Sequence, residues 1–180
     1  MISSRLPLSL ALSLCASVAL AQPASFESAI KDIPDLPEVQ VSWGLQIPLR
    51  DGVKLNATRY QKAGSTERVP CIFTLTPYIA QNYPDRGMYF AANGYVFLSI
   101  DTRGRGNSGG EFTPLLQEAK DGHDVVEWLA QQDFCNGKVT MWGGSYAGYN
   151  QWATAKEFPR GLATIVPVAS PYAGIDFPMN

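Results

Sequence analysis

A single serine stands between small residues where an apolar strand pattern gives way to a helical pattern. Residues 139–142 are apolar, and Gly143 and Ala147 lie two positions before and after Ser145. This order is typical of a nucleophile elbow, a strained strand-to-helix turn that exposes the serine hydroxyl and tolerates only small neighbours. Such a turn also directs the amide of the next residue, Tyr146, toward the oxyanion of an acyl-transfer reaction. The pattern therefore predicts Ser145 as a nucleophile.

The expected elements around this turn alternate between strands and helices. Strand patterns span residues 39–47, 53–60, 69–75, 95–100, 139–142 and 161–168, and helix patterns span residues 86–93, 117–131 and 146–158. Arg50-Asp51-Gly52 joins the first two strands as an antiparallel hairpin, the second strand having one buried and one solvated face. From residue 69 onward, the alternation indicates βαβ units and a parallel sheet covered on both faces. The predicted fold class is α/β, in the order of the first half of an α/β-hydrolase.

The positions of Ser145 and Tyr78 in the sequence leave two points about the site open. Gly143-Gly144-Ser145 could be only a tight turn, but the strand before it, the helix after it and the βαβ order favour a nucleophile. Tyr78 follows a buried strand, where an α/β-hydrolase supplies its second oxyanion donor. From position alone, an ordinary packed aromatic residue is the better interpretation of Tyr78.

His123 is the only histidine of the chain and a candidate for the general base. It precedes the serine and lies in the first turn of an expected surface helix, whereas α/β-hydrolases order their residues serine, acid, histidine. We therefore expect a solvated helix residue at His123. Asp176 follows the serine too closely to be the expected acid.

Residues 101–110 form a glycine-rich segment after a predicted strand. Its glycines do not have the spacing of a dinucleotide-binding loop, and no Gly-Lys-Ser/Thr is present, so we predict no cofactor. We predict no metal site either. The segment is expected to turn tightly beside the active site, with Asp101 and Arg103 paired inside the protein.

Residues 1–21 have a positively charged start, an apolar centre and a small-x-small end. This is the pattern of a secretory signal peptide, with cleavage before Gln22 and a periplasmic or secreted product. A membrane anchor is the alternative, but the apolar centre is interrupted and short for a span. Residues 22–38 are expected to form an extended leader before a single domain.

Composition places few limits on function. The chain has 180 residues, is 46% hydrophobic and carries a net charge of −2, so it can bury a sizeable core. It has no basic footprint for nucleic acid and no polybasic segment for a membrane surface. Cys71 and Cys135 are expected to be two separate thiols.

Several separated motifs together resemble a known family. They are Thr76-Pro77-Tyr78, Asp101 through Phe112, Asp121-Gly122 with Glu127-Trp128-Leu129, and Cys135-Asn136-Gly137-Lys138-Val139 leading into Trp142 through Gly148. In this order they resemble the Xaa-Pro dipeptidyl-peptidase-like and cocaine-esterase-like family of α/β-hydrolases. The resemblance implies a serine hydrolase of ester or amide bonds in small molecules or short peptides, with Ser145 as nucleophile. It also implies that the Tyr78 hydroxyl joins the Tyr146 amide in binding the oxyanion, which reverses the interpretation from position.

Members of that family continue with a helical cap, the catalytic Asp and His, and a jelly-roll domain. We therefore expect residues 39–180 to be the N-terminal part of a catalytic domain, truncated after the strand that follows the elbow and inactive alone. The alternatives are a non-catalytic binding module that kept the fold and an inactive truncated gene product. Ester or β-lactam acyl hydrolysis and release of prolyl dipeptides both remain open, as does the oligomeric state.

Overall fold

The computed structural model describes residues 37–171. The predicted signal peptide 1–21, nearly all of the leader 22–38, and Asp176 lie outside the described residues. The described residues form six strands: β1 (Val39–Pro48), β2 (Lys54–Lys62), β3 (Val69–Thr76), β4 (Val96–Asp101), β5 (Cys135–Gly144) and β6 (Leu162–Val168). The helices are η1 (Ala80–Asn82, a 3-10 turn), α2 (Pro84–Ala92), α3 (Glu118–Ala130) and α4 (Tyr146–Ala155).

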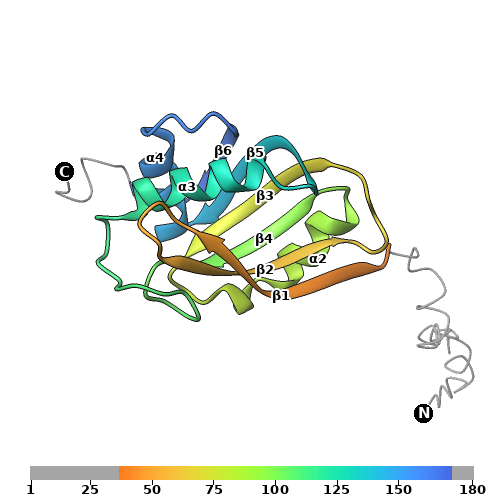
Figure 1. Ribbon diagram of the computed structural model, residues 1–180, viewed down its shortest axis with the longest axis horizontal. Helices are drawn as coiled ribbons and strands as arrows, with labels where there is room; N and C mark the ends of the chain where they lie inside the picture. Colours follow the sequence, from red (N-terminus) through yellow and green to blue (C-terminus); the bar gives the residue numbers. More distant parts are fainter. Residues whose placement is uncertain (1–36, 172–180) are drawn as a thin grey trace, which may run out of the picture. The chain divides into compact units, whose positions relative to one another are not determined.

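The strands form one mixed sheet in the order β1-β2-β4-β3-β5-β6 (Figure 1). β1 and β2 are antiparallel, and β2 is also antiparallel to β4. β3, β4, β5 and β6 are parallel to one another. This is the predicted α/β arrangement of an N-terminal hairpin followed by parallel strands, and each parallel strand ends at the same edge of the sheet.

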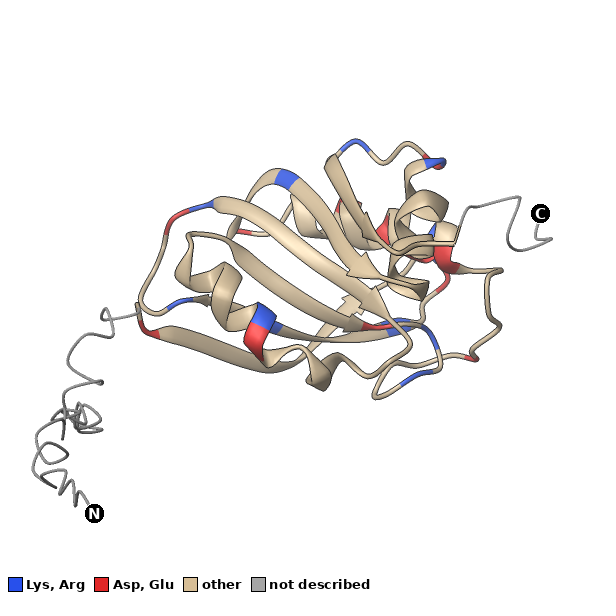
Figure 2. Cartoon of the chain, turned by 180° about the vertical axis from the view of Figure 1, so that it is seen from behind, with Lys and Arg blue, Asp and Glu red and all other residues tan. Residues whose placement is uncertain are grey.

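Helices cover both faces of the sheet. α3 packs on one face over a large core that includes Phe73, Leu98 and Met141, and α4 packs against α3 and the β5–β6 end. α2 lies on the opposite face, which Figures 1 and 2 show from the two sides, over a smaller core around Ile72 and Phe97. Both faces of the sheet bury apolar side chains, which explains why the sequences of β3 and β4 are nearly continuous apolar runs.

The prediction that β2 has one solvated face is wrong. Asn56 and Thr58, which were expected to face water, are 4% and 1% exposed. The cause is that β2 is an inner strand between β1 and β4 and carries a layer on each face. Asn56 lies beneath the glycine-rich segment, where its backbone N–H donates to Ser108 Oγ at 2.8 Å.

Element boundaries differ from the sequence pattern at a few places. β5 begins at Cys135 instead of residue 139, because residues before the apolar run already pair with β3. The turn η1 carries no helical pattern and was not predicted. α2 ends at the expected Asn93-Gly94 cap, where Gly94 takes φ 85°.

The cysteines, the charged residues and the helix lengths can each be compared with the sequence within the described residues. Cys71 and Cys135 are both buried and free, as predicted. Acidic and basic residues are interspersed over loops and helices (Figure 2). Within residues 37–171, no helix has both the length and the apolar character needed to cross a membrane.

Candidate active site

Ser145 lies at the turn between the end of β5 and the start of α4. Its backbone has φ 55° and ψ −120°, a strained conformation for a residue with a side chain. A Cβ on Gly143 would come within 2.7 Å of Ala147 Cβ and 2.9 Å of Thr74 Oγ1, so only glycine fits there. The small residues on either side of Ser145 are therefore a packing requirement of the turn, and the serine side chain is left exposed.

Gln151 holds this turn from beneath, and the sequence did not single it out. Its side chain is completely buried in α4. Its Nε2 donates to the carbonyls of Gly143 at 3.1 Å and Ala147 at 2.9 Å, and its Oε1 accepts from Val166 N–H at 2.7 Å. One amide thus ties the end of β5, the first turn of α4 and β6 together.

The structure brings together the three predicted site residues. The Tyr78 hydroxyl donates to Ser145 Oγ at 3.2 Å, and the Tyr146 N–H donates to the Tyr78 hydroxyl oxygen at 3.4 Å. Tyr78 lies 67 residues before Ser145 in the chain. They meet because β3 and β5 are parallel neighbours whose carboxyl ends share one edge of the sheet.

Polar side chains hold the backbone around Tyr78 through contacts that the sequence did not predict. Thr76 Oγ1 accepts from the Tyr78 N–H at 3.0 Å, and Asn82 Nδ2 donates to the Tyr78 carbonyl at 2.7 Å. Arg105 Nε donates to the Pro77 carbonyl at 3.2 Å. Thr76 and Arg105 belong to motifs of the resemblance, but those motifs do not predict these hydrogen bonds, because each acts through a turn whose conformation is set by tertiary contacts.

The side chain of Tyr146 points away from its own amide into a buried polar cluster. Its hydroxyl contacts the carboxylate of Glu118, which is 4% exposed, and accepts from the Leu115 N–H at 2.9 Å. Burial, and then the hydrogen bond to Glu118, raise the pKa of the Tyr146 hydroxyl. The hydroxyl therefore keeps its proton and anchors the start of α4 to the start of α3.

The predicted pairing of Asp101 with Arg103 is wrong. Arg103 pairs with Asp121 at 2.7 Å and with Asp51 at 2.7 Å, so it joins α3 to the β1–β2 turn. Its guanidinium lowers the pKa of the Asp51 carboxyl. β4 ends at Asp101 and the chain turns at Arg103, so the two side chains are not held side by side on one strand. Asp101 instead accepts a hydrogen bond from the Ala80 N–H at 2.7 Å.

His123 lies in the second turn of α3 and is partly exposed. Its Nδ1 lies 3.0 Å from Arg50 Nη2 and 3.4 Å from Asp124 Oδ1. Among residues 37–171, no histidine hydrogen-bonds Ser145. The described part of the chain also gathers no group of three or more His, Cys, Asp and Glu side chains that could hold a metal ion.

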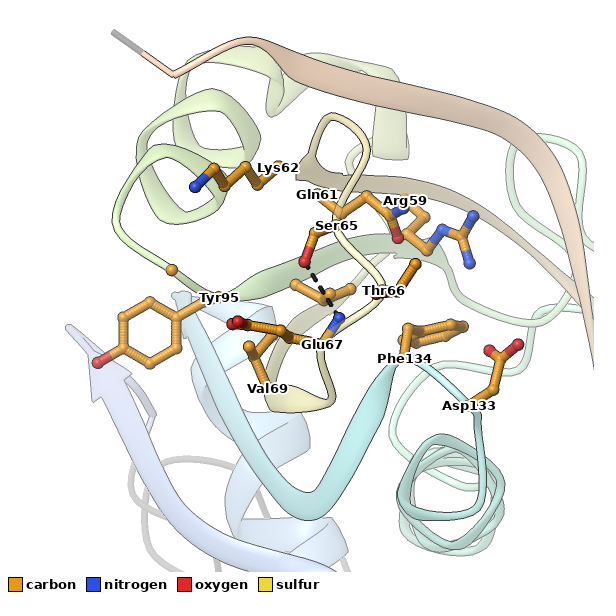
Figure 3. A pocket seen from close by; sticks show the side chains of 12 residues that line it. Arg59, Gln61, Lys62, Ser65, Thr66, Glu67, Val69, Tyr95, Asp133 and Phe134 are labelled. Atoms are coloured by element: carbon orange, nitrogen blue, oxygen red, sulfur yellow. Dashed lines mark hydrogen bonds between the residues drawn. The ribbon is translucent and has the colours of Figure 1, made fainter.

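A hollow of about 430 Å³ lies where the parallel strands begin, at the end of the sheet opposite Ser145 (Figure 3). Val69, Val96 and Phe134 line it, and these residues stand at or beside the starts of β3, β4 and β5. Ser145 follows the end of β5, so the hollow and the serine lie at opposite ends of the parallel strands. We therefore assign the hollow no part in the chemistry at Ser145.

Sheet order, elbow and helices define the chain as an α/β-hydrolase fold, and solved structures agree. An α-amino acid ester hydrolase superposes with a TM-score of 0.68 at 24% identity, covering 90% of this chain and 29% of that one. An aminopeptidase from a marine sediment Thaumarchaeota archaeon gives 0.67 at 28% identity, covering 78% of this chain and 27% of that one.

Residues 51–177 match the X-Pro dipeptidyl-peptidase (S15 family), and the chain belongs to this family. It is 32% identical to the cocaine esterase of Rhodococcus sp. (strain MB1 Bresler) over 133 residues, which is 71% of this chain and 23% of the esterase. It is 30% identical to the Xaa-Pro dipeptidyl-peptidase of Lactobacillus helveticus (strain DPC 4571) over 105 residues, 49% of this chain and 13% of that enzyme. The chain thus spans about a quarter or less of the length of these two relatives, and its family is one of hydrolases.

Proposed function

We propose that this chain supplies the nucleophile and the oxyanion donors of a serine hydrolase that cleaves ester or amide bonds. The observation that carries the proposal is the position of the Tyr78 hydroxyl, 3.2 Å from Ser145 Oγ and 3.4 Å from the Tyr146 nitrogen. Two donors and a strained, exposed serine converge on one point, which is what acyl transfer requires. Membership of a hydrolase family supports the same reaction class.

In the proposed reaction, Ser145 Oγ attacks the substrate carbonyl carbon while its proton passes to a general base. The carbonyl electron pair moves to the oxygen, which accepts hydrogen bonds from the Tyr78 hydroxyl and the Tyr146 N–H. Collapse of this intermediate re-forms the carbonyl and expels the alcohol or amine, which takes the proton. Water then hydrolyses the acyl-serine by the same two steps and releases the acid. The base and its orienting carboxylate are expected beyond residue 180.

We propose small-molecule esters or other acyl compounds as the first class of substrate to test. The match to the esterase covers more of this chain than the match to the dipeptidyl-peptidase, which favours esters over Xaa-Pro dipeptides.

We also propose that residues 1–21 direct export to the periplasm or the medium. Sequencing of the mature N-terminus should then begin at Gln22, and an intact Met1 would contradict export by cleavage.

Fluorophosphonate labelling tests the nucleophile directly. The full-length gene product should be labelled covalently on Ser145, and Ser145→Ala should abolish both labelling and ester turnover. Ser65→Ala, at the far hollow, is the matched control and should leave both unchanged. An unlabelled full-length protein would favour a non-catalytic binding module. Substantial serine-dependent turnover by residues 22–180 alone would contradict the expectation that the base lies outside this chain.

A further inference from the structure

Asp101 is a fully buried carboxylate at the edge of the sheet where the proposed chemistry occurs. It is the last residue of β4, and it pairs in register with Thr76, the last residue of β3. Its side chain is 0% exposed. Thr76 is followed after one residue by Tyr78, so the carboxylate lies beneath the segment that carries the Tyr78 hydroxyl.

Within the described part of the chain, N–H groups alone hydrogen-bond this carboxylate. Oδ1 accepts from the Ala80 N–H at 2.7 Å, and Oδ2 accepts from the Asn107 N–H at 3.3 Å and from Asn56 Nδ2 at 3.4 Å. Among residues 37–171, no Lys, Arg or His forms an ion pair with it. A Cβ on Gly106 would overlap the carboxylate, so the glycine-rich segment closes tightly over it. Burying a carboxylate without a cation is costly, and the hydrogen bonds from these three N–H groups offset that cost.

The segment that Asp101 binds is strained. Ile79, between Tyr78 and Ala80, has φ 72°, a conformation that β-branched residues rarely adopt. The Tyr78 side chain is 46% exposed, so packing does not fix its position. Its hydroxyl bonds Ser145 and Tyr146, and the backbone that carries it is held by hydrogen bonds on both sides of Ile79.

We propose that Asp101 is a positioning residue for the Tyr78 hydroxyl: its carboxylate binds the Ala80 amide and so fixes the strained segment that carries Tyr78. This inference rests on the proposed function, because it assigns Asp101 to the oxyanion site. Asparagine cannot replace aspartate here. Its amide offers one acceptor and one NH2 group, so an N–H donor would face another donor at either Ala80 or Asn107. The Tyr78 segment would then shift, although Tyr78 itself is unchanged.

A double-mutant cycle in the full-length protein separates positioning from general stability. Tyr78→Phe should lower kcat by about 10²- to 10³-fold, as for loss of one oxyanion donor. Asp101→Asn should lower kcat by about 10- to 100-fold, with KM changed by less than about threefold, because a small displacement of a catalytic donor is costly. In the Tyr78→Phe background, Asp101→Asn should have almost no further effect, since there is no hydroxyl left to position. Titration with the fluorophosphonate counts the competent active sites, so kcat can be expressed per competent site.

Asp121→Asn is the matched control, because Asp121 is also a buried carboxylate but holds Arg103 and not the Tyr78 segment. Its effect on kcat should be the same in both backgrounds. Equal effects of Asp101→Asn on kcat in both backgrounds, or no effect on kcat at all, would overturn the positioning role of Asp101. Covalent labelling of Ser145 would still support the proposed hydrolase in that case. Asp101→Ser replaces Asp101→Asn if the latter gives no folded protein. Failure of both variants to fold would assign Asp101 to folding and overturn its positioning role.

Discussion

The backbone and the side chain of Tyr146 serve different parts of the structure. The amide donates to the Tyr78 hydroxyl oxygen, beside Ser145, where the proposed oxyanion would form. The hydroxyl contacts Glu118 and Leu115, which tie α4 to the start of α3. A residue anchored at the end of its side chain has a fixed backbone, so the hydroxyl contributes to the geometry of the amide.

The raised pKa of Tyr146 gives a pH dependence of stability. Burial and then Glu118 raise this pKa above the value of about 10 that tyrosine has in an unfolded chain. Above about pH 10, the unfolded chain releases this proton and the native chain retains it, so stability falls as pH rises. The urea midpoint of the full-length protein should fall between pH 9 and pH 11, and fall less steeply in Tyr146→Phe. Parallel decreases in the two proteins would contradict a raised pKa at Tyr146.

The elbow depends on close packing between β5 and α4. Gly143→Ala would place a methyl group 2.7 Å from Ala147 Cβ at φ 154°. We expect this variant to lose about 1–3 kcal/mol of stability, as overpacked sites do, and to react more slowly with the fluorophosphonate. Gly109→Ala is the control, because its nearest contact would be an ordinary 3.5 Å to the Lys54 carbonyl. Equal denaturation midpoints for the two variants would contradict a packed elbow.

Local patterns predicted the elements that form this site. Continuous apolar runs indicated the inner parallel strands, and the Asp51-Gly52 turn indicated the hairpin. The small residues around Ser145 indicated the turn that the structure has at φ 55°. Each of these patterns depends on neighbours in sequence, so it can be recognised without a structure.

Contacts between distant elements could not be predicted in the same way. Asp101 was assigned to Arg103 because the two lie close in sequence, whereas the chain turns after β4 and Arg103 pairs with Asp51 and Asp121. The solvated face expected for β2 is buried because a helix and the glycine-rich segment cover it. Gln151 has no recognisable spacing, and its role follows only from the meeting of three elements. The role proposed for Tyr78 came from a resemblance, since position alone favoured packing.

At the scale of the whole sheet, β6 is an edge strand in the described part of the chain. It pairs with β5 on one side. Val166 and Val168, two residues apart and so on the same face, are 42% and 50% exposed. An edge strand with exposed apolar residues is a site for pairing with another chain.

Residues 22–180 expressed alone should therefore self-associate through β6. Sedimentation at several concentrations should detect oligomers or aggregates, and Val166→Lys with Val168→Lys should reduce them, because charges on an edge strand oppose pairing. Phe158→Lys is the control: Phe158 is 86% exposed but lies outside the strands, so its replacement should have a smaller effect. A soluble monomer with a sharp, cooperative melt would contradict the prediction. An equal benefit from Phe158→Lys would indicate general surface hydrophobicity in place of edge pairing.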